Sequence, residues 1–367
     1  MNRTLLHAID GLAYGATGLL GIHWRTRAVA PQVAAMHGFS WSPERDSVTF
    51  WREWSLGQFG PSAAPGAAAI FSSVDSFDTP RPVDWRTGPG TLAADGGQCG
   101  AVAAQYGFVD AFEQLRQLVA LDIANGDADL NTLERFSYWA SSFRYMRGIA
   151  RFECDWAAYE AELGAVQKIA DRGAQIAAAN GPLMAARVSL VANASRMLWD
   201  HLARVSSLGD LGTTTNVLSQ SVTHALGDEP TAALLALANI SALPAAAGVP
   251  TTFDPSAAAP LLRVNVVRGL LGAGEAFNLE AFLLAPGGAA ATKGAALTLF
   301  TAPAGGSPWA PTAMARVAAD RAVFSASVAG AAVADDFMYY IEASLADGSR
   351  LFFPPTAPAG PNFVALI

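Results

Sequence analysis

The sequence predicts a multidomain α+β protein with a remnant of a (β/α)8 barrel, a mainly helical middle domain and a C-terminal antiparallel β-sandwich. Three observations carry this prediction. Near its beginning the chain has an apolar run that is followed by a signal for the start of a helix. The middle of the chain has helical periodicity, and near residue 259 the hydrophobic period changes to two. We expect the terminal β/α unit in residues 1–40, the helical domain in 41–250 and the sandwich in 259–367. The 367 residues are enough for two or three cores.

The first forty residues show the order helix, strand, helix. Residues 2–13 have apolar side chains near helical spacing, and Pro31 is placed to begin a second helix through Met36. Between them, residues 19–24 form an apolar run typical of a parallel strand covered on both faces. A parallel strand needs parallel neighbours, and none is expected in residues 40–367. We therefore interpret this segment as the last unit of a barrel whose other strands are absent.

The middle of the chain has helical periodicity. The signal Ser42-Pro43-Glu44 predicts a helix with Val48, Trp51, Trp54 and Phe59 near one face. A loop is expected at residues 78–100. The remaining helices are expected at 65–77, 108–124, 131–164, 166–180, 183–206 and 213–226, and residues 231–250 should be a helix that runs into a linker.

Two stripes follow the helix expected at 131–164. Phe136, Trp139, Phe143 and Met146 are predicted to face the core. Arg144, Arg147 and Arg151 form the second stripe, which is either a solvated basic face or the lining of a substrate cleft. The stretch Gly209 to Asn216 is interpreted as a helix N-cap at Thr213 or Thr214, with a loop over a barrel mouth as the alternative.

The last 110 residues or so contain six short runs with period two, separated by Gly, Pro and Asp clusters. This pattern predicts an immunoglobulin-like or fibronectin-III-like sandwich. The segment PPTAPAGPN should belong to a terminal edge. The expected core includes Phe277, Leu279, Leu297, Leu299, Phe324, Tyr340 and Leu351.

Composition excludes several classes of function. The net charge is −8 and no block of Lys or Arg occurs, which argues against nucleic acid or an anionic membrane surface as partner. No uninterrupted run of eighteen apolar residues predicts a membrane span. Nothing indicates a cofactor or a metal site, because His201 and His224 lack zinc-ligand spacing.

The cysteines and the glycosylation motifs do not identify the cellular compartment of the protein. Cys99 and Cys154 are expected to be reduced thiols, with one disulfide as the alternative. Sequons of the form N-x-S/T begin at Asn2, Asn193 and Asn239, a number that chance supplies at this length. The first residues have no signal-peptide core, so a secreted parent protein would need its signal elsewhere.

The candidate binding residues follow the apolar run 19–24. His23, Trp24, Arg25 and Arg27 would stand at the carboxyl end of a barrel strand, where barrel enzymes bind substrate. Alternation along a strand places His23 and Arg25 on one side and Trp24 on the other. The blander interpretation is a buried core histidine and surface ion pairs for the arginines. Because no Asp or Glu occurs between Thr17 and Pro31, the catalytic residues remain unassigned.

The stretch GLLGIHWRTR, the Pro-started helix and the W-x2-W-x4-FG pattern at Trp51, Trp54, Phe59 and Gly60 resemble the barrel end of large glycoside hydrolases. The architecture is similar to that of α-glucuronidases and β-hexosaminidases, in which a helical domain and a sandwich follow the barrel. The resemblance implies a carbohydrate partner for His23, Trp24, Arg25 and Arg27. A complete barrel would need roughly 200 further residues upstream.

Two functions follow. The first is the C-terminal part of a glycoside hydrolase acting on an oligo- or polysaccharide, inactive alone because it lacks an evident pair of catalytic carboxylates. The second is a non-catalytic carbohydrate-binding or scaffolding protein. Both make carbohydrate the partner, and the first adds the missing upstream barrel domain.

Overall fold

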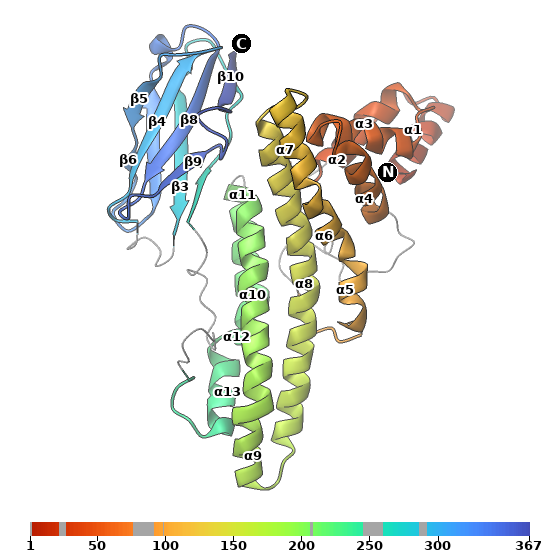
Figure 1. The fold of residues 1–367 in the computed structure, drawn as a ribbon, viewed down its shortest axis with the longest axis vertical. Coiled ribbons are helices and arrows are strands. Elements are labelled where there is room, and N and C mark those ends of the chain that lie inside the picture. The colour runs from red at the N-terminus through yellow and green to blue at the C-terminus, as the bar shows by residue number, and fades with distance from the viewer. Residues whose placement is uncertain are drawn as a thin grey trace. The chain divides into compact units, whose positions relative to one another are not determined.

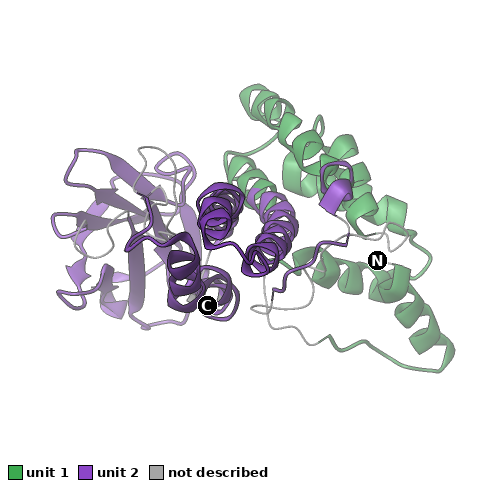
Figure 2. Ribbon diagram, turned by 90° about the horizontal axis from the view of Figure 1, so that it is seen from below, with its two compact units in different colours: residues 1–80, 105–140 green, residues 81–104, 141–367 purple. Residues whose placement is uncertain are grey.

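The computed structural model describes residues 2–21, 27–75, 92–97, 99–205, 208–244, 260–285 and 292–367. Its α+β composition agrees with the sequence prediction: helices occupy the chain up to Ala238, and every described strand lies beyond residue 260. The chain divides into two compact units, residues 1–80 with 105–140 and residues 81–104 with 141–367 (Figure 2). In the described ranges no helix is long and apolar enough to cross a membrane.

The first unit is helical. It contains α1 (Asn2–Ala13), α2 (Ala30–Trp41), α3 (Ser47–Phe59), α4 (Ala64–Asp75), α6 (Gly107–Gln114), α7 (Arg116–Asn125) and the first turns of α8 (Asn131–Gln167). Helix α2 begins beside Pro31, as expected. Helix α3 begins later than expected, because the cap is Asp46, whose carboxylate accepts a 2.6 Å hydrogen bond from the Thr49 backbone.

Aromatic side chains form the core of this unit. Trp54 and Phe71 have ring centroids 4.8 Å apart, and Phe112 stacks on Phe136 at 4.7 Å. Trp51 and Phe59 are buried, whereas Val48 is 70% exposed, so the expected position of Val48 near the same face was wrong. The W-x2-W-x4-FG pattern is therefore explained by packing.

The glycine of that pattern has a steric reason. Gly60 ends α3 with φ of 84°, and a Cβ there would lie 2.5 Å from Oδ2 of Asp122. The same oxygen accepts a 2.9 Å hydrogen bond from the Ser62 backbone, and Asp122 is buried. Only glycine fits both the positive φ and the close approach.

The second unit joins a helical bundle to a sandwich. Its helices are η1 (Cys99–Ala101), the rest of α8, α9 (Arg172–Ala178), η2 (Ala179–Leu183), α10 (Met184–Arg204), α11 (Leu208–Val217), η3 (Leu218–Val222), α12 (Thr223–Leu226) and α13 (Asp228–Ala238), and α5 (Val102–Gln105) crosses the boundary. Helices α8 and α10 lie side by side (Figure 1). They approach closely at Gly148, where a Cβ would lie 3.1 Å from Cα of Met197.

Two expectations about these helices were wrong. Helix α11 begins at Leu208, so Thr213 and Thr214 lie inside a helix and neither caps it. The segment expected as one helix at 108–124 is two helices, α6 and α7, which meet at Leu115. The stripe Phe136, Trp139, Phe143 and Met146 is buried, as predicted.

The C-terminal strands form two sheets. The strands are β1 (Leu261–Val264), β2 (Leu270–Leu271), β3 (Phe277–Leu284), β4 (Ala296–Pro303), β5 (Ala310–Ala313), β6 (Ala315–Arg316), β7 (Val323–Val328), β8 (Phe337–Ser344), β9 (Arg350–Phe353) and β10 (Asn362–Leu366). One sheet has the order β1-β3-β7-β6. The other has the order β2-β10-β8-β4-β5, with β9 also paired to β8. Pairing is antiparallel except between β10 and β2.

The core of the sandwich contains most of the expected residues. Phe277, Leu279, Leu297, Leu299 and Phe324 are buried in it, and Leu351 packs at its margin. Tyr340 is buried outside that core, because it points to the opposite face of β8 from Tyr339 and Ile341. The last strand is also not an edge: β10 lies between β2 and β8.

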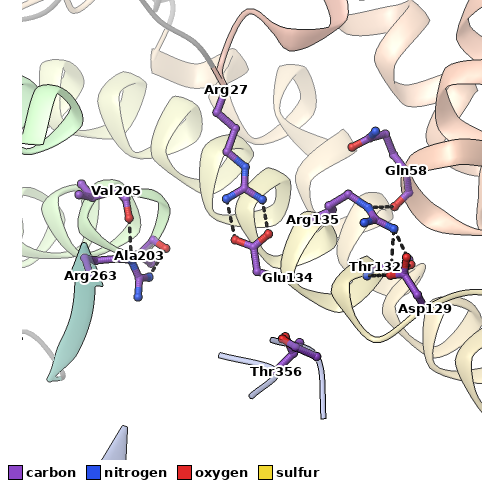
Figure 3. A network of polar contacts seen from close by, with 11 residues as sticks. Arg27, Gln58, Asp129, Thr132, Glu134, Arg135, Ala203, Val205, Arg263 and Thr356 are labelled. Atoms are coloured by element: carbon purple, nitrogen blue, oxygen red, sulfur yellow. Dashed lines mark hydrogen bonds and ion pairs between the residues drawn. The ribbon is translucent and has the colours of Figure 1, made fainter. Parts of the chain in front are cut away.

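Arg263 joins the sandwich to the helices of the same unit. Its Nε donates to the Val205 carbonyl at 2.6 Å and its Nη2 to the Ala203 carbonyl at 2.9 Å, at the C-terminus of α10 (Figure 3). A small hydrophobic cluster accompanies these bonds, with Phe282 of β3 against Leu202 and Val205. The outer face of the four-stranded sheet is therefore the one that packs on helices.

The expected barrel strand is only partly described. Residues 19–21 are in neither a helix nor a strand, and the rest of the run 19–24 lies outside the described residues. Leu20 is 90% exposed. Within the described ranges the structure has no closed barrel, so the coarse α+β prediction is confirmed and the barrel remnant is not.

Candidate functional site

The predicted binding residues are described only at Arg27. His23, Trp24 and Arg25 lie outside the described residues. The two terminal nitrogens of Arg27 donate to the carboxylate oxygens of Glu134 on α8 (Figure 3). The guanidinium also lies 4.2 Å from the ring centroid of Tyr138. These contacts fix the segment before α2 to α8 within the first unit, and they engage the donors that a sugar would otherwise use.

The arginine stripe of α8 is half-buried. Arg144, Arg147 and Arg151 all have intermediate exposure, and each has polar or ring contacts. A fully solvated face is therefore not what the structure shows. A hollow of about 490 Å³ in the second unit is lined by other residues, namely Arg187, Thr223, Asp228 and Thr231 together with apolar side chains near α12 and α13.

Arg187, Thr223 and Thr231 in that hollow bond neighbouring parts of the fold. Arg187 is 1% exposed, and its Nη2 donates to Thr231 at 2.8 Å and to the Leu226 carbonyl at 3.3 Å. Thr223 donates to the Leu218 carbonyl at 2.8 Å. Burial lowers the pKa of Arg187, partly offset by the Tyr159 phenol. Arg187 thereby holds the end of α12 to the start of α13.

Cys99 and Cys154 form a disulfide, so the expectation of reduced thiols was wrong. The bond attaches η1 to the middle of α8. Residues 92–97 then run beside α8 as a strap: the Asp95 backbone donates to the Glu153 carbonyl at 3.2 Å and the Leu92 backbone to Ser221 at 2.9 Å. Sequence spacing alone does not reveal this pairing, because the strap places the two cysteines together only after folding.

Glu153 on α8 is a largely buried carboxyl with a raised pKa. Burial raises its pKa to about 7, the Ala93 backbone N–H opposes this effect, and the Asp95 carboxylate adds to it. A carboxyl with such a pKa is suited to general acid catalysis in a cleft. Here, however, its oxygen accepts the Ala93 N–H of the strap at 3.3 Å. The geometry assigns Glu153 to holding the strap.

An aromatic cluster stands on the outer face of the six-stranded sheet. Phe300 of β4 and Tyr340 of β8 are paired across strands and stack with centroids 4.7 Å apart. Trp309, just before β5, meets Tyr340 edge-on at 4.8 Å, and Phe352 of β9 lies 6.4 Å from it. We call Phe300, Trp309, Tyr340 and Phe352 the outer aromatic cluster.

The cluster combines partly exposed rings with a charged margin. Phe300, Trp309 and Phe352 have intermediate exposure, whereas Tyr340 beneath them is 7% exposed. Glu342, two residues along β8, forms an ion pair with Arg350 of β9 at 3.4 Å. Arg350 is largely exposed, so its remaining donors face water.

The sequence carried a signal for this cluster. Adjacent aromatic residues in one strand, Tyr339 and Tyr340, must point to opposite faces. One of them therefore had to leave the core. The pairing with Phe300 depended on the register of β4 and β8, which the sequence did not reveal.

In the described part of the chain, no three His, Cys, Asp or Glu side chains are grouped in a way that would hold a metal ion. Neither the protein-family models nor the curated proteins include a match to this chain.

Proposed function

We propose that this protein binds carbohydrate without hydrolysing it, and that the outer aromatic cluster is the binding surface. The observation that carries the proposal is the presence of partly exposed rings beside an ion pair on a sheet face. A pyranose has an apolar C–H face and a rim of hydroxyls. Aromatic rings bury the first, and carboxylate or guanidinium groups bond the second.

The packing of the sandwich supports the choice of this face. The four-stranded sheet uses its outer side chains, including Phe282 and Val323, against the helices. The six-stranded sheet places the aromatic cluster on its own outer face instead. Rings at such a position lose rather little conformational entropy on binding, because strand pairing and mutual stacking already orient them.

The described residues give less support to a hydrolytic active site than to a binding surface. Glycoside hydrolysis generally needs two carboxylates on either side of the scissile bond. The described candidate with a raised pKa, Glu153, bonds the strap. Arg27, which the sequence assigned to substrate, has its guanidinium engaged by Glu134. A binding role requires neither residue.

The proposal is tested by affinity electrophoresis and calorimetry of the whole chain on glucans, xylans, mannans and uronic-acid polymers. We expect Trp309→Ala and Phe352→Ala each to weaken binding about tenfold or more, since truncating a binding aromatic often costs on the order of 2 kcal/mol. Trp199→Ala is the matched control, because Trp199 is 42% exposed on α10. Unchanged binding in both cluster variants, or a loss of the same size in the control, contradicts the proposal.

A hydrolase origin is the second candidate, and one observation favours it. Leu6, Leu12 and Leu20 are 55%, 64% and 90% exposed. If another part of a protein covered these exposed leucines, their burial would be favourable. In this proposal the covering part is the rest of a barrel, and residues 1–40 are its last β/α unit.

The two candidates differ in the activity that they predict after an upstream barrel has been added to the chain. The 367-residue chain should turn over no aryl glycoside or uronide under either candidate. If it is joined to an upstream barrel, only the hydrolase origin predicts activity, and Arg25→Ala should then lower turnover more than Arg144→Ala. A lost charged hydrogen bond to substrate corresponds to about 1.5–3 kcal/mol.

A further inference from the structure

Three sequons occur in the chain, and the structure places them in different surroundings. Asn193 lies in the interior of α10 and Asn2 in the first turn of α1. Asn239 follows the last residue of α13. An N-linked glycan needs an acceptor amide that reaches solvent and is not needed by the fold, so these sites are not equivalent.

Asn193 is committed to the helical bundle. Its side-chain nitrogen donates to the Asp155 carboxylate on α8, which also accepts a 3.0 Å hydrogen bond from Ser189. The hydroxyl of its sequon, Ser195, bonds the Val191 carbonyl at 2.9 Å. In a helix, residues two apart do not face each other. A glycan at Asn193 would break the contact between α8 and α10.

Asn239 is presented in the opposite way. It is exposed and caps α13 in the left-handed conformation, with φ of 56° and ψ of 44°. Among non-glycine residues, asparagine adopts this conformation with the least strain. The chain turns there, Ser241 is exposed as well, and the cap bonds to the Leu235 carbonyl use backbone groups. Modification of the side-chain amide therefore disturbs no described contact.

The disulfide supplies an independent argument about the compartment. Disulfides form and persist in secreted and lumenal proteins, and they are rare in reducing compartments. Cys99–Cys154 therefore favours maturation in an oxidising compartment, and the lumen in which oligosaccharides are transferred to asparagine is one such compartment. We infer that Asn239 is a sequon that accepts an N-linked glycan and that Asn193 does not accept one.

Glycan transfer to Asn239 is a substitution at the anomeric carbon of the donor. The Asn239 amide nitrogen attacks the anomeric carbon of a polyprenyl-pyrophosphate-linked oligosaccharide and forms a C–N bond. The bond from that carbon to the pyrophosphate oxygen breaks, and the lipid pyrophosphate leaves. The amide nitrogen gives one proton to a base of the transferase.

The test is expression of the full chain through the secretory pathway of a eukaryotic cell, behind an added signal peptide. Peptide-N-glycosidase treatment in heavy-oxygen water converts each glycosylated Asn to labelled Asp, which mass spectrometry locates. We expect label at Asn239 and none at Asn193. Non-reducing digestion of the same sample should recover the Cys99–Cys154 peptide pair.

Two variants separate glycosylation from folding. Asn239→Gly removes the acceptor and keeps a residue suited to the left-handed cap. Ser241→Ala leaves Asn239 in place and removes the sequon. Both should lose the part of the glycosidase-sensitive electrophoretic shift that comes from residue 239. Ser195→Ala removes the sequon of Asn193 but keeps its bond to Asp155, and it should leave the shift unchanged. Unlabelled Asn239 in folded secreted protein, or labelled Asn193, overturns the inference.

Discussion

Phe300 and Tyr340 face each other across β4 and β8, with ring centroids 4.7 Å apart and ring planes inclined by only 10°. The pair stands on the outer face of the sheet, while Tyr339, the preceding residue, is buried in the sandwich core. Trp309 and Phe352 close around Tyr340. Tyr340 therefore supports the rings that remain partly exposed, and stability and binding depend on different members of the cluster.

Tyr340→Ala should lower the free energy of unfolding by about 3 kcal/mol, near the cost of truncating a buried aromatic side chain. Trp309→Ala should change the free energy of unfolding much less, because it removes a ring that is partly in water already. Tyr340→Phe is the matched control and keeps the stack. Urea unfolding followed by circular dichroism measures all three variants, and equal losses for Tyr340→Ala and Tyr340→Phe would disprove the support role.

Glu153 should make the protein more stable in mild acid. Its folded-state pKa is raised from 4.5 to about 7, so the folded state binds a proton that the unfolded state releases between these values. Stability therefore falls as the pH rises through that window, by up to about 3 kcal/mol. Glu153→Gln should remove this dependence, because an amide does not titrate in this pH range. Its oxygen can still accept the Ala93 N–H.

Urea titrations at pH 5 and pH 8 measure this effect, and Glu160→Gln on the exposed side of the same helix is the control. We expect Glu153→Gln to exceed the natural protein in stability at pH 8. An unaltered pH dependence in that variant would place the titrating group elsewhere.

The Cys99–Cys154 bond should stabilise the strap. It closes a loop of 55 residues, for which chain entropy predicts about 4 kcal/mol. A double Cys→Ser variant should lose about that amount. Hydrogen exchange at the Leu92 and Asp95 amides should quicken, since both bond across to helices. Exchange at Thr49, in α3, is the internal reference, and equal acceleration there would mean global rather than local loosening.

The Arg27–Glu134 pair should be structural. Both side chains are about a quarter exposed, so the coupling measured by a double-mutant cycle should be about 1 kcal/mol. Arg27→Ala should leave saccharide binding of the whole chain unchanged. If it instead weakens binding while stability is retained, the binding surface includes the segment that the sequence identified.

Sequence patterns predicted the parts of this fold that depend on local periodicity. The buried stripe of Phe136 and Phe143 and the inward residues of β3 and β4 follow from repeats of 3.6 and 2. The cap at Asp46 was missed because a nearer Ser-Pro-Glu signal competes with it. The strand register, the strand order and the disulfide could not be predicted from the sequence, because each of them joins residues that are distant in sequence.

The candidate site shows the same limit. The polar cluster around Arg27 stood out because it follows an apolar run, yet its described member pairs with Glu134, 107 residues away. The outer aromatic cluster draws Phe300, Trp309, Tyr340 and Phe352 from separate segments. Only the pairing of β5 with β4, of β4 with β8 and of β8 with β9 brings them together.

Residues 259–367 should fold alone into the sandwich and retain the binding of the whole chain. The core that joins the two sheets lies entirely within this segment. Separation removes the carbonyls of Ala203 and Val205 that Arg263 bonds, and it exposes Phe282. We therefore expect a less stable domain with a strand-type far-UV spectrum, and Phe282→Thr should keep it monomeric.

A helical or disordered spectrum would show that the sandwich depends on the helices. If the segment folds but binds no saccharide that the whole chain binds, the outer aromatic cluster is not the binding surface.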